Sequence, residues 1–252
     1  MSARPATPAL ACGDADVLSF DLFDTILLRG LESERRRFAW IARESARGLA
    51  PEGIGRSPAH LLRSRLDVQS AAYRALEAVN PNGDVRLADL HRLQADLLGL
   101  PARAIPILLD ADLAAERRFS SANAALVGAL RDLRKAGRRV IAISDTYYSE
   151  ADLRRLLADM LGPIPFDAIY ASSDWNATKK SGELFARVLQ AENVAPGAML
   201  HWGDDCRADQ IMAAAKGLRV HWAPRPALVH LRRRFDAAAW RASHWTPRWR
   251  LA

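Results

Sequence analysis

Short apolar runs alternate with longer amphipathic segments along most of the chain. The runs rich in β-branched and aromatic residues lie at 17–22, 139–144, 166–171, 198–203 and 218–223. Each of the last four follows a segment whose apolar residues recur at helical spacing. Strands that alternate with helices build a parallel sheet, because each strand needs a crossover to run in the same direction as the one before it. The pattern therefore predicts an α/β fold with a parallel sheet.

The first predicted crossover is too long to be a single helix. It holds roughly 95 residues before the helical segment at 121–135, whereas about a dozen would suffice. Its periodicity predicts helices at 31–49, 57–79, 85–99 and 101–119, separated by breaks that contain proline and glycine. We therefore predict an α-helical lobe at 31–119, inserted into the α/β core.

Composition is consistent with one core and an accessory lobe, since half of the 252 residues are apolar. No apolar run reaches the roughly 18 residues of a membrane span, and the start of the chain lacks the apolar region of a secretory signal. Two cysteines, Cys12 and Cys206, form neither a disulfide framework nor a CxxC metal pair. These features predict a cytoplasmic protein. The predicted divisions are a disordered leader at 1–15, a core at 16–30 and 120–224, and a tail at 225–252.

Most of the net charge of +7 lies in the predicted tail. From Arg225 onward the chain has seven arginines, no lysine and one acidic residue, Asp236. Arginines interleaved with tryptophans also occur at anionic membrane surfaces and on nucleic acids. Leu228, Leu231, Phe235 and Ala239 recur at helical spacing, however. We therefore expect a basic helix whose apolar face packs on the body or on another subunit, rather than a membrane or nucleic-acid contact.

Polar residues follow the predicted strands, where the carboxyl ends of a parallel sheet form a ligand crevice. Asp21 follows the first strand, Ser144 ends the second, and Lys179 and Lys180 come after the third. The fourth is followed by the acidic cluster Asp204, Asp205 and Asp209. Phosphoryl transfer through an aspartyl-phosphate needs such a set: an attacking carboxylate, acidic ligands for magnesium, and a hydroxyl and an ammonium on the phosphate oxygens.

With these residues in this order, residues 17 to about 223 resemble the haloacid dehalogenase superfamily. The resemblance implies a Rossmann-like core and identifies the inserted helices as a C1 cap, which usually selects the substrate. It makes Asp21 the nucleophile and a metal ligand. Ser144, with Asp145 beside it, would bind phosphate, and Lys179 would be the lysine of the third motif, with Lys180 as the alternative. Asp204 and Asp209 would hold Mg²⁺, with Asp205 as the alternative to Asp209.

The chain departs from this pattern at Phe23. Family phosphatases usually carry a second aspartate at this position, which protonates the leaving group and then activates water. General acid–base help of this kind is commonly worth about 10²–10⁴-fold in rate. The backbone carbonyl of Phe23 would still serve as the metal ligand that the family takes from this residue. Asp24 is the nearest carboxylate that could replace the missing acid, and its alternative role is to cap the following turn.

The resemblance implies a magnesium-dependent hydrolase, a phosphatase or phosphotransferase acting on a small phosphorylated metabolite. The variant FDxFDT (residues 20–25) resembles predicted hydrolases from bacterial surface-polysaccharide contexts, which suggests a sugar phosphate. An aromatic residue at position 23 also occurs in metal-independent 2-haloacid dehalogenases. Those enzymes have generally lost the acids of the fourth motif, whereas this chain retains them, so we favour phosphate chemistry. The third alternative is a module that binds a phosphorylated ligand or partner with little or no turnover.

Overall fold

The computed structural model describes residues 13–243, and a five-stranded parallel sheet forms its core. The order across the sheet is β5-β4-β1-β6-β7, which places β1 in the centre. The strands are β1 (Val17–Phe20), β4 (Arg139–Ser144), β5 (Ala168–Ala171), β6 (Met199–Gly203) and β7 (Arg219–Trp222). The predicted α/β fold with a parallel sheet is therefore confirmed. The first strand is shorter than predicted, because the chain turns after Phe20.

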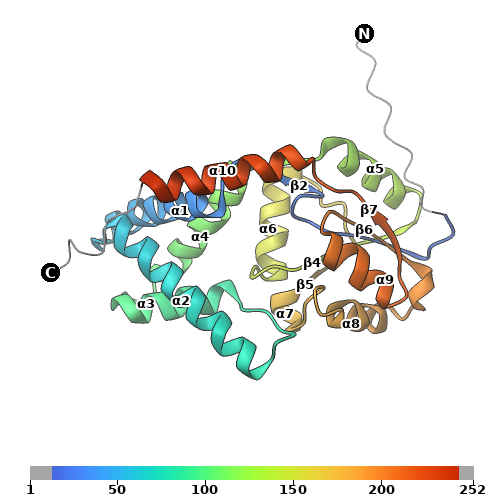
Figure 1. Ribbon diagram of the computed structural model, residues 1–252, viewed down its shortest axis with the longest axis horizontal. Helices are drawn as coiled ribbons and strands as arrows, with labels where there is room; N and C mark the ends of the chain where they lie inside the picture. The colour runs from blue at the N-terminus through green and yellow to red at the C-terminus, as the bar shows by residue number, and fades with distance from the viewer. Residues whose placement is uncertain (1–12, 244–252) are drawn as a thin grey trace, which may run out of the picture.

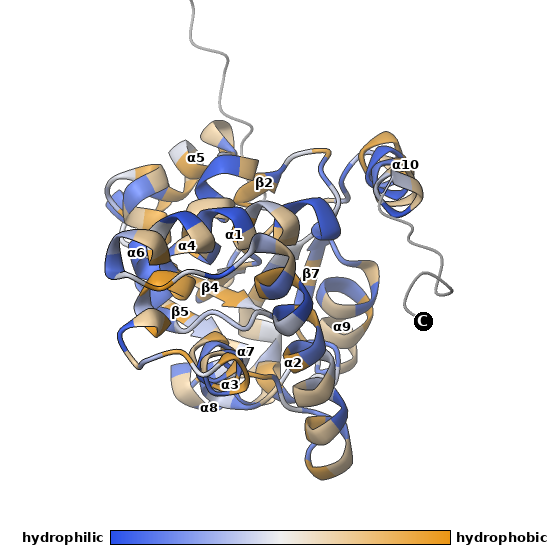
Figure 2. Cartoon of the chain, turned by 90° about the vertical axis from the view of Figure 1, so that its left-hand side faces the viewer, coloured by the Kyte–Doolittle hydropathy of each residue, from blue (hydrophilic) through white to orange (hydrophobic). Residues whose placement is uncertain are grey.

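Helices cover both faces of the sheet, as alternating strand side chains require. Leu18 and Phe20 of β1 pack in the cluster formed with α5 (Ala124–Lys135) and α6 (Glu150–Leu161). Val17 packs on the opposite face, with α8 (Glu183–Glu192) and α9 (Ala213–Ala215). Figure 2 shows the hydrophobic colour of β4 and β5 between helices that carry hydrophilic residues.

A lobe of four helices lies beside the sheet domain (Figure 1). They are α1 (Glu34–Leu49), α2 (Pro58–Val79), α3 (Leu87–Leu98) and α4 (Ala104–Phe119). Each lies within a segment that periodicity predicts to be helical. Both connections between lobe and core pass through a small antiparallel pair, β2 (Leu27–Arg29) with β3 (Ser120–Ala122). The sequence does not predict this pair, because three residues are too few to show a period of two.

A buried polar cluster joins three of the lobe helices. Asp112 of α4 is fully buried and accepts a hydrogen bond from His91 Nε2 of α3, at 2.8 Å. Its other oxygen, Oδ1, lies 3.7 Å from Arg65 Nη2 of α2, whose side chain is 3% exposed. Charges removed from water in this way are tolerated only when paired. The cluster therefore fixes how the lobe helices pack.

The last described helix, α10 (Ala227–Ser243), lies across the junction of lobe and core (Figure 1). Arg233 donates to both carboxylate oxygens of Asp24, at 2.7 and 2.9 Å, and to the backbone carbonyls of Arg29 and Gly30. One turn further on, Asp236 accepts from Arg36 of α1. One helix thus binds the core loop after β1 and the first turn of the lobe.

The apolar face of α10 does not pack on the body as predicted. Leu228, Leu231 and Phe235 are 56%, 47% and 65% exposed, whereas Arg233 points inward. The physical reason is that the surface beneath the helix offers a carboxylate and backbone carbonyls, which pair with a guanidinium and not with leucine. Contact of this face with another subunit stays a prediction. Residues 244–252 of the predicted tail, with Trp245 and Trp249, lie outside the described residues.

At the other end, residues 1–12 of the predicted leader, with Cys12, also lie outside the described part of the chain. Ala15, which the same prediction includes, is 3% exposed and packs on the core. The adjacent Asp16 N–H donates to the carbonyl of Ala198 at 2.8 Å. Packing therefore begins before the predicted boundary. Within residues 13–243, no helix combines the length and the apolar character that a membrane crossing requires.

The buried cluster in the lobe predicts an unequal effect of two substitutions in α4. Asp112→Ala should lower the free energy of unfolding by about 3–5 kcal/mol, because it leaves the Arg65 guanidinium buried without its counterion. Asp110→Ala removes an exposed ion pair with Arg155 instead, and should cost at most about 1 kcal/mol. Urea denaturation of both variants measures the difference, and equal losses would contradict it.

Candidate active site

The site begins where β1 ends at the centre of the sheet. The Asp21 N–H donates to the carbonyl of Trp202 at 2.8 Å, which continues the pairing with β6 by one residue. The chain then turns back, with the Ile26 and Leu27 N–H groups both donating to the Leu22 carbonyl. Asp24 has a left-handed backbone with φ 64°, a conformation that aspartate tolerates better than most residues. This turn leaves the Asp21 side chain at the carboxyl edge of the sheet.

A buried ammonium joins the nucleophile candidate to the acidic cluster. Lys179 Nζ lies 2.5 Å from Asp21 Oδ1 and 2.6 Å from Asp209 Oδ1. The three residues are 3%, 6% and 2% exposed, respectively. No hydrogen bond to Asp21 Oδ2 is formed within residues 13–243. Lys179, rather than Lys180, therefore makes the contact expected of the third-motif lysine, and the second oxygen of Asp21 is left free.

A chain of buried groups supports Asp209 from behind. The Asp209 side chain packs against Gly203, where an added Cβ would lie 2.2 Å from Asp209 Cγ. His201 Nε2 lies 3.2 Å from Asp209 Oδ1, and His201 Nδ1 lies 2.9 Å from the Ser19 hydroxyl. Burial lowers the pKa of His201, so the ring is neutral, with Nε2–H donating to Asp209 and Ser19 donating to Nδ1. Gly203, His201 and Ser19 thus hold the carboxylate in place.

Three carboxylates form a group that suits a hard cation. Asp21, Asp204 and Asp209 each offer an oxygen, and the three oxygens lie within 4.8 Å of one another. Carboxylate oxygens are the ligands that Mg²⁺ prefers, so these residues fit the ion that the sequence predicts. Asp205 has a different contact, because its Oδ1 accepts from the Ala208 N–H and caps the following π-helix (Cys206–Met212). The predicted ligation by the Phe23 carbonyl stays a prediction.

Crowding of these acids shifts their protonation. Burial raises the pKa of Asp21 to about 8, with a further rise from Asp209 and Asp204, while Lys179 opposes it. Burial also raises the pKa of Asp204 to about 6, reinforced by Asp24 and Asp209. Despite its burial, Asp209 has a lowered pKa, because Lys179 and His201 donate to it. One cation among three carboxylates leaves excess negative charge, which a divalent ion would neutralise.

Two buried hydroxyls near the strand ends are without partners. Ser144 Oγ at the end of β4 and Thr25 Oγ1 in the turn after β1 find no hydrogen-bond acceptor or donor among residues 13–243. A buried hydroxyl without a partner is costly, and such a group is often kept for a ligand. The neighbouring Asp145 accepts from the N–H groups of Lys179 and Lys180, at 2.6 and 3.2 Å. It therefore orders the lysine loop, while the Lys180 side chain faces solvent.

Phe23 lies under a guanidinium. The Arg29 Cζ atom stands 3.9 Å above the ring centroid of Phe23. Arg29 in turn forms a two-point ion pair with Glu116 of the lobe, at 3.1 and 2.7 Å. Phe23 is also 8% exposed and contacts the ring of Tyr148. Where the family pattern places an acid, this chain has an aromatic ring covered by an arginine that links core and lobe.

Asp24 is engaged elsewhere. Arg233 occupies both of its carboxylate oxygens, and Arg225 lies 3.6 Å away. Burial would raise the pKa of Asp24, but Arg233, Arg29 and Arg225 together hold it below its ordinary value. A carboxylate held ionised in this way is a poor proton donor. The geometry therefore favours the structural role of Asp24 over its predicted role as the replacement acid.

Sequence reasoning did not assign His201, Arg29 or Arg233 to the site. Two-residue alternation along β6 places His201 on the face of the sheet that contacts the ring of Phe185. From the sequence alone, such a residue is assigned to the hydrophobic core. Arg29 and Arg233 act through partners that are 87 and 209 residues away along the chain. No local pattern carries that information.

Comparison with known proteins gives the fold a name. No family model and no curated protein matches this sequence. Among solved structures, a 2-haloacid dehalogenase from Pseudomonas syringae pv. tomato aligns with a TM-score of 0.59 and 19% identity, over 82% of this chain and 86% of its own. A HAD family enzyme from Bacteroides thetaiotaomicron aligns with a TM-score of 0.56 and 14% identity, over 87% and 98%.

The wild-type Bacteroides enzyme was also solved with magnesium and inorganic phosphate. That structure aligns with a TM-score of 0.52 and 13% identity, over 82% of this chain and 93% of its own. These likenesses confirm the predicted Rossmann-like core with a helical cap, which is the haloacid dehalogenase fold. The lobe of α1 to α4 is accordingly called the cap below.

The raised pKa values predict how stability depends on pH and magnesium. Asp21 and Asp204 have higher pKa values in the folded chain than the ordinary aspartate pKa of 3.8, so folding makes them bind protons more tightly. Their contribution to stability is therefore full below about pH 4 and is lost as pH rises through about 6 and 8. In EDTA, the melting temperature should fall over this window. Mg²⁺ at about a hundredfold excess over its Kd should raise it by roughly 5 °C or more.

This rise should be larger at pH 8 than at pH 5.5, because protons compete with the ion for the same oxygens. Differential scanning calorimetry of wild type beside Asp209→Asn measures it. A thermal shift that is absent, equal at both pH values, or unchanged in Asp209→Asn would contradict a magnesium site here.

Proposed function

We propose that this chain, which has the haloacid dehalogenase fold, is a magnesium-dependent hydrolase that removes phosphate from a small phosphorylated metabolite through Asp21. The observation that carries the proposal is the buried contact of Lys179 with Asp21 and Asp209, beside the carboxylate of Asp204. A metal-independent reaction at carbon has no need for this set of acids. Excess negative charge of this kind suits a divalent cation, which together with Lys179 would attract a phosphoryl group.

In the proposed reaction, Asp21 Oδ2 attacks phosphorus while the bond from phosphorus to the ester oxygen breaks. Lys179 holds Oδ1, which fixes the direction of attack, and its positive charge balances the phosphoryl oxygens. The hydroxyls of Ser144 and Thr25, which have no partner within the described part of the chain, donate to those oxygens. Asp21, Asp204 and Asp209 would hold Mg²⁺, which supplies further positive charge when bound. Water then attacks phosphorus, releasing inorganic phosphate and restoring the Asp21 carboxylate.

The leaving group has no protein acid in this proposal. Phe23 carries no proton to give, and Asp24 is held ionised by Arg233. The departing oxygen therefore takes its proton from solvent, and water attacks the aspartyl-phosphate without a positioned base. Both steps are slower than in an enzyme with a general acid–base residue, by a factor on the order of 10²–10⁴. Slow turnover and a long-lived aspartyl-phosphate follow from this arrangement.

Two other functions remain as outcomes of the test. Phe23 favours a module that binds a phosphorylated ligand and turns it over little or not at all. The same residue is compatible with dehalogenation without a metal, as the sequence resemblance implies. Tight ligand binding without any turnover would support the first, and halide release from 2-haloacids in EDTA would support the second.

Removal of the nucleophile predicts complete loss of phosphate release. Asp21→Asn keeps the size and a hydrogen-bonding oxygen but cannot form the acyl phosphate, so the rate on a panel of phosphate esters should fall to background. Addition of EDTA to wild type should have the same effect. Phosphate release is the measurement, and Asp110→Asn, which alters an exposed ion pair of α4 outside the site, is the control. Residual turnover in Asp21→Asn would exclude the proposed chemistry.

Restoring an acid at position 23 should not restore a fast enzyme. In Phe23→Asp, the new carboxylate would lie beside Arg29, whose charge lowers the pKa of a neighbouring acid by about 1–3 units. We therefore expect the gain in kcat to stay far below the about 10²–10⁴-fold that a functional general acid supplies. Steady-state kinetics on the best ester measures it, with Phe23→Leu as the control for packing. A gain of that full size would show that Arg29 does not control this position.

A further inference from the structure

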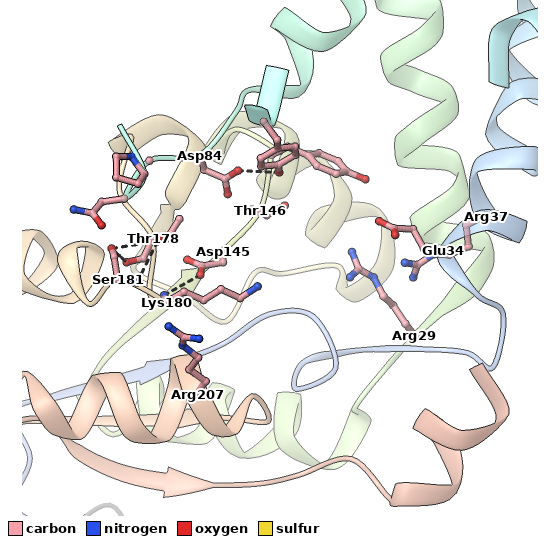
Figure 3. Close-up of a pocket in the computed structure, with 15 residues that line it drawn as sticks. Arg29, Glu34, Arg37, Asp84, Asp145, Thr146, Thr178, Lys180, Ser181 and Arg207 are labelled. Atoms are coloured by element: carbon pink, nitrogen blue, oxygen red, sulfur yellow. Dashed lines mark hydrogen bonds between the residues drawn. The ribbon is translucent and has the colours of Figure 1, made fainter. Parts of the chain in front are cut away.

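A cavity of about 660 Å³ opens between the cap and the carboxyl edge of the sheet. Figure 3 shows its lining, with Arg29, Glu34 and Arg37 on one side and Asp145, Lys180 and Arg207 facing them. Ligand pockets commonly measure about 300–1,000 Å³, so this cavity accepts much more than a phosphate group. Because Asp145 holds the backbone of Lys179, the cavity adjoins the proposed site of phosphoryl transfer.

Three of the four cationic side chains in this cavity have no counterion. Arg29 is paired with Glu116 through two hydrogen bonds. The side chains of Arg37, Lys180 and Arg207 form neither a hydrogen bond nor an ion pair within residues 13–243. Arg37 comes from the first turns of the cap, whereas Lys180 and Arg207 come from the core. Burial, with Arg29 nearby, lowers the pKa of Arg37, while the charges of Glu116 and Glu34 oppose this shift.

The acidic side chains in the same lining are mostly engaged. Asp145 accepts from two backbone N–H groups of the lysine loop. Asp84 accepts from the hydroxyls of Tyr73 and Ser172. Only Glu34, an exposed residue at the start of α1, has no partner among the described residues. Neutral donors leave Asp84 and Asp145 charged, so the four cationic and three acidic side chains of the lining give a net charge of only +1. Arg37, Lys180 and Arg207, which form no ion pair among the described residues, are the cations available to an anion.

We propose that this cavity binds a second anionic group of the substrate, a carboxylate or a second phosphate, in addition to the phosphoryl group that Asp21 receives. The proposal rests on the function proposed above. Arg37 supplies a half-buried guanidinium, which pairs with an oxyanion through two parallel N–H donors. Lys180 and Arg207, which are exposed, add attraction at longer range. Hydroxyl and amide groups of Thr178, Ser181 and Asn82 make the rest of this lining suitable for a sugar or another polyol.

Two matched ligand pairs test the proposal in binding experiments that need no turnover. The pairs are glycerol 3-phosphate with 3-phosphoglycerate, and fructose 6-phosphate with fructose 1,6-bisphosphate, which separate a carboxylate from a phosphate. Calorimetric titration of Asp21→Asn with Mg²⁺ should show at least one doubly anionic member binding about tenfold or more tightly than its partner. Adding Arg37→Gln should remove most of this ratio, whereas Arg43→Gln, an exposed substitution on the same helix, should leave it intact.

Equal affinities within both pairs would overturn the proposal. It would also be overturned if Arg37→Gln weakened the binding of singly and doubly anionic ligands by the same factor. Absence of measurable binding by both doubly anionic ligands would overturn it as well. The outcome is separable from the proposed hydrolysis. If wild type releases no phosphate but the ratio depends on Arg37, the anion site stands and the hydrolase proposal fails. If phosphate is released but the ratio is one, the reverse holds.

Discussion

The ammonium of Lys179 between Asp21 and Asp209 is the contact on which the site depends. It joins three segments that the sheet brings to one edge: the turn after β1, the loop before α8 and the π-helix after β6. Without it, three carboxylates within 4.8 Å would repel one another in a buried place. Much of the surrounding structure keeps this arrangement intact. Gly203 makes room for Asp209, His201 donates to it, and Asp145 holds the loop that carries the lysine.

The position two residues after Asp21 takes part in a contact between core and cap. Phe23, Arg29 and Glu116 form a stack and an ion pair that cross from the core to the cap. The position where the resemblance implies a proton donor therefore serves here as part of the joint between cap and core. Chemistry that needs no protonated leaving group, or that benefits from a persistent covalent phosphate, is compatible with such a joint.

The sheet and the order of the site residues could be predicted, because both are visible in short stretches of sequence. The strands are runs rich in β-branched or aromatic residues, and a polar residue such as Asp21, Ser144 or Asp204 stands at the end of several of them. Lys179, the residue preferred over Lys180 from the sequence, contacts Asp21 in the structure, and its role as the third-motif lysine stays a prediction. What could not be predicted depends on partners distant in sequence. The pair β2–β3, the inward arginine of α10 and the support of Asp209 by His201 arise from contacts that no window of neighbouring residues contains.

The attachment of α10 also bears on the order in which the molecule assembles. The bond between Arg233 and Asp24 closes a loop of 209 residues, longer than the 182 residues that separate paired positions of β1 and β6. Contacts of such long range carry a high entropic cost early in folding and gain support only after the intervening parts are in place. During synthesis, cap and core would each collapse before Arg233 emerges. The contacts of α10 with Asp24 and Arg36 are therefore expected to form last, onto a cap and core that Arg29 and Glu116 already join.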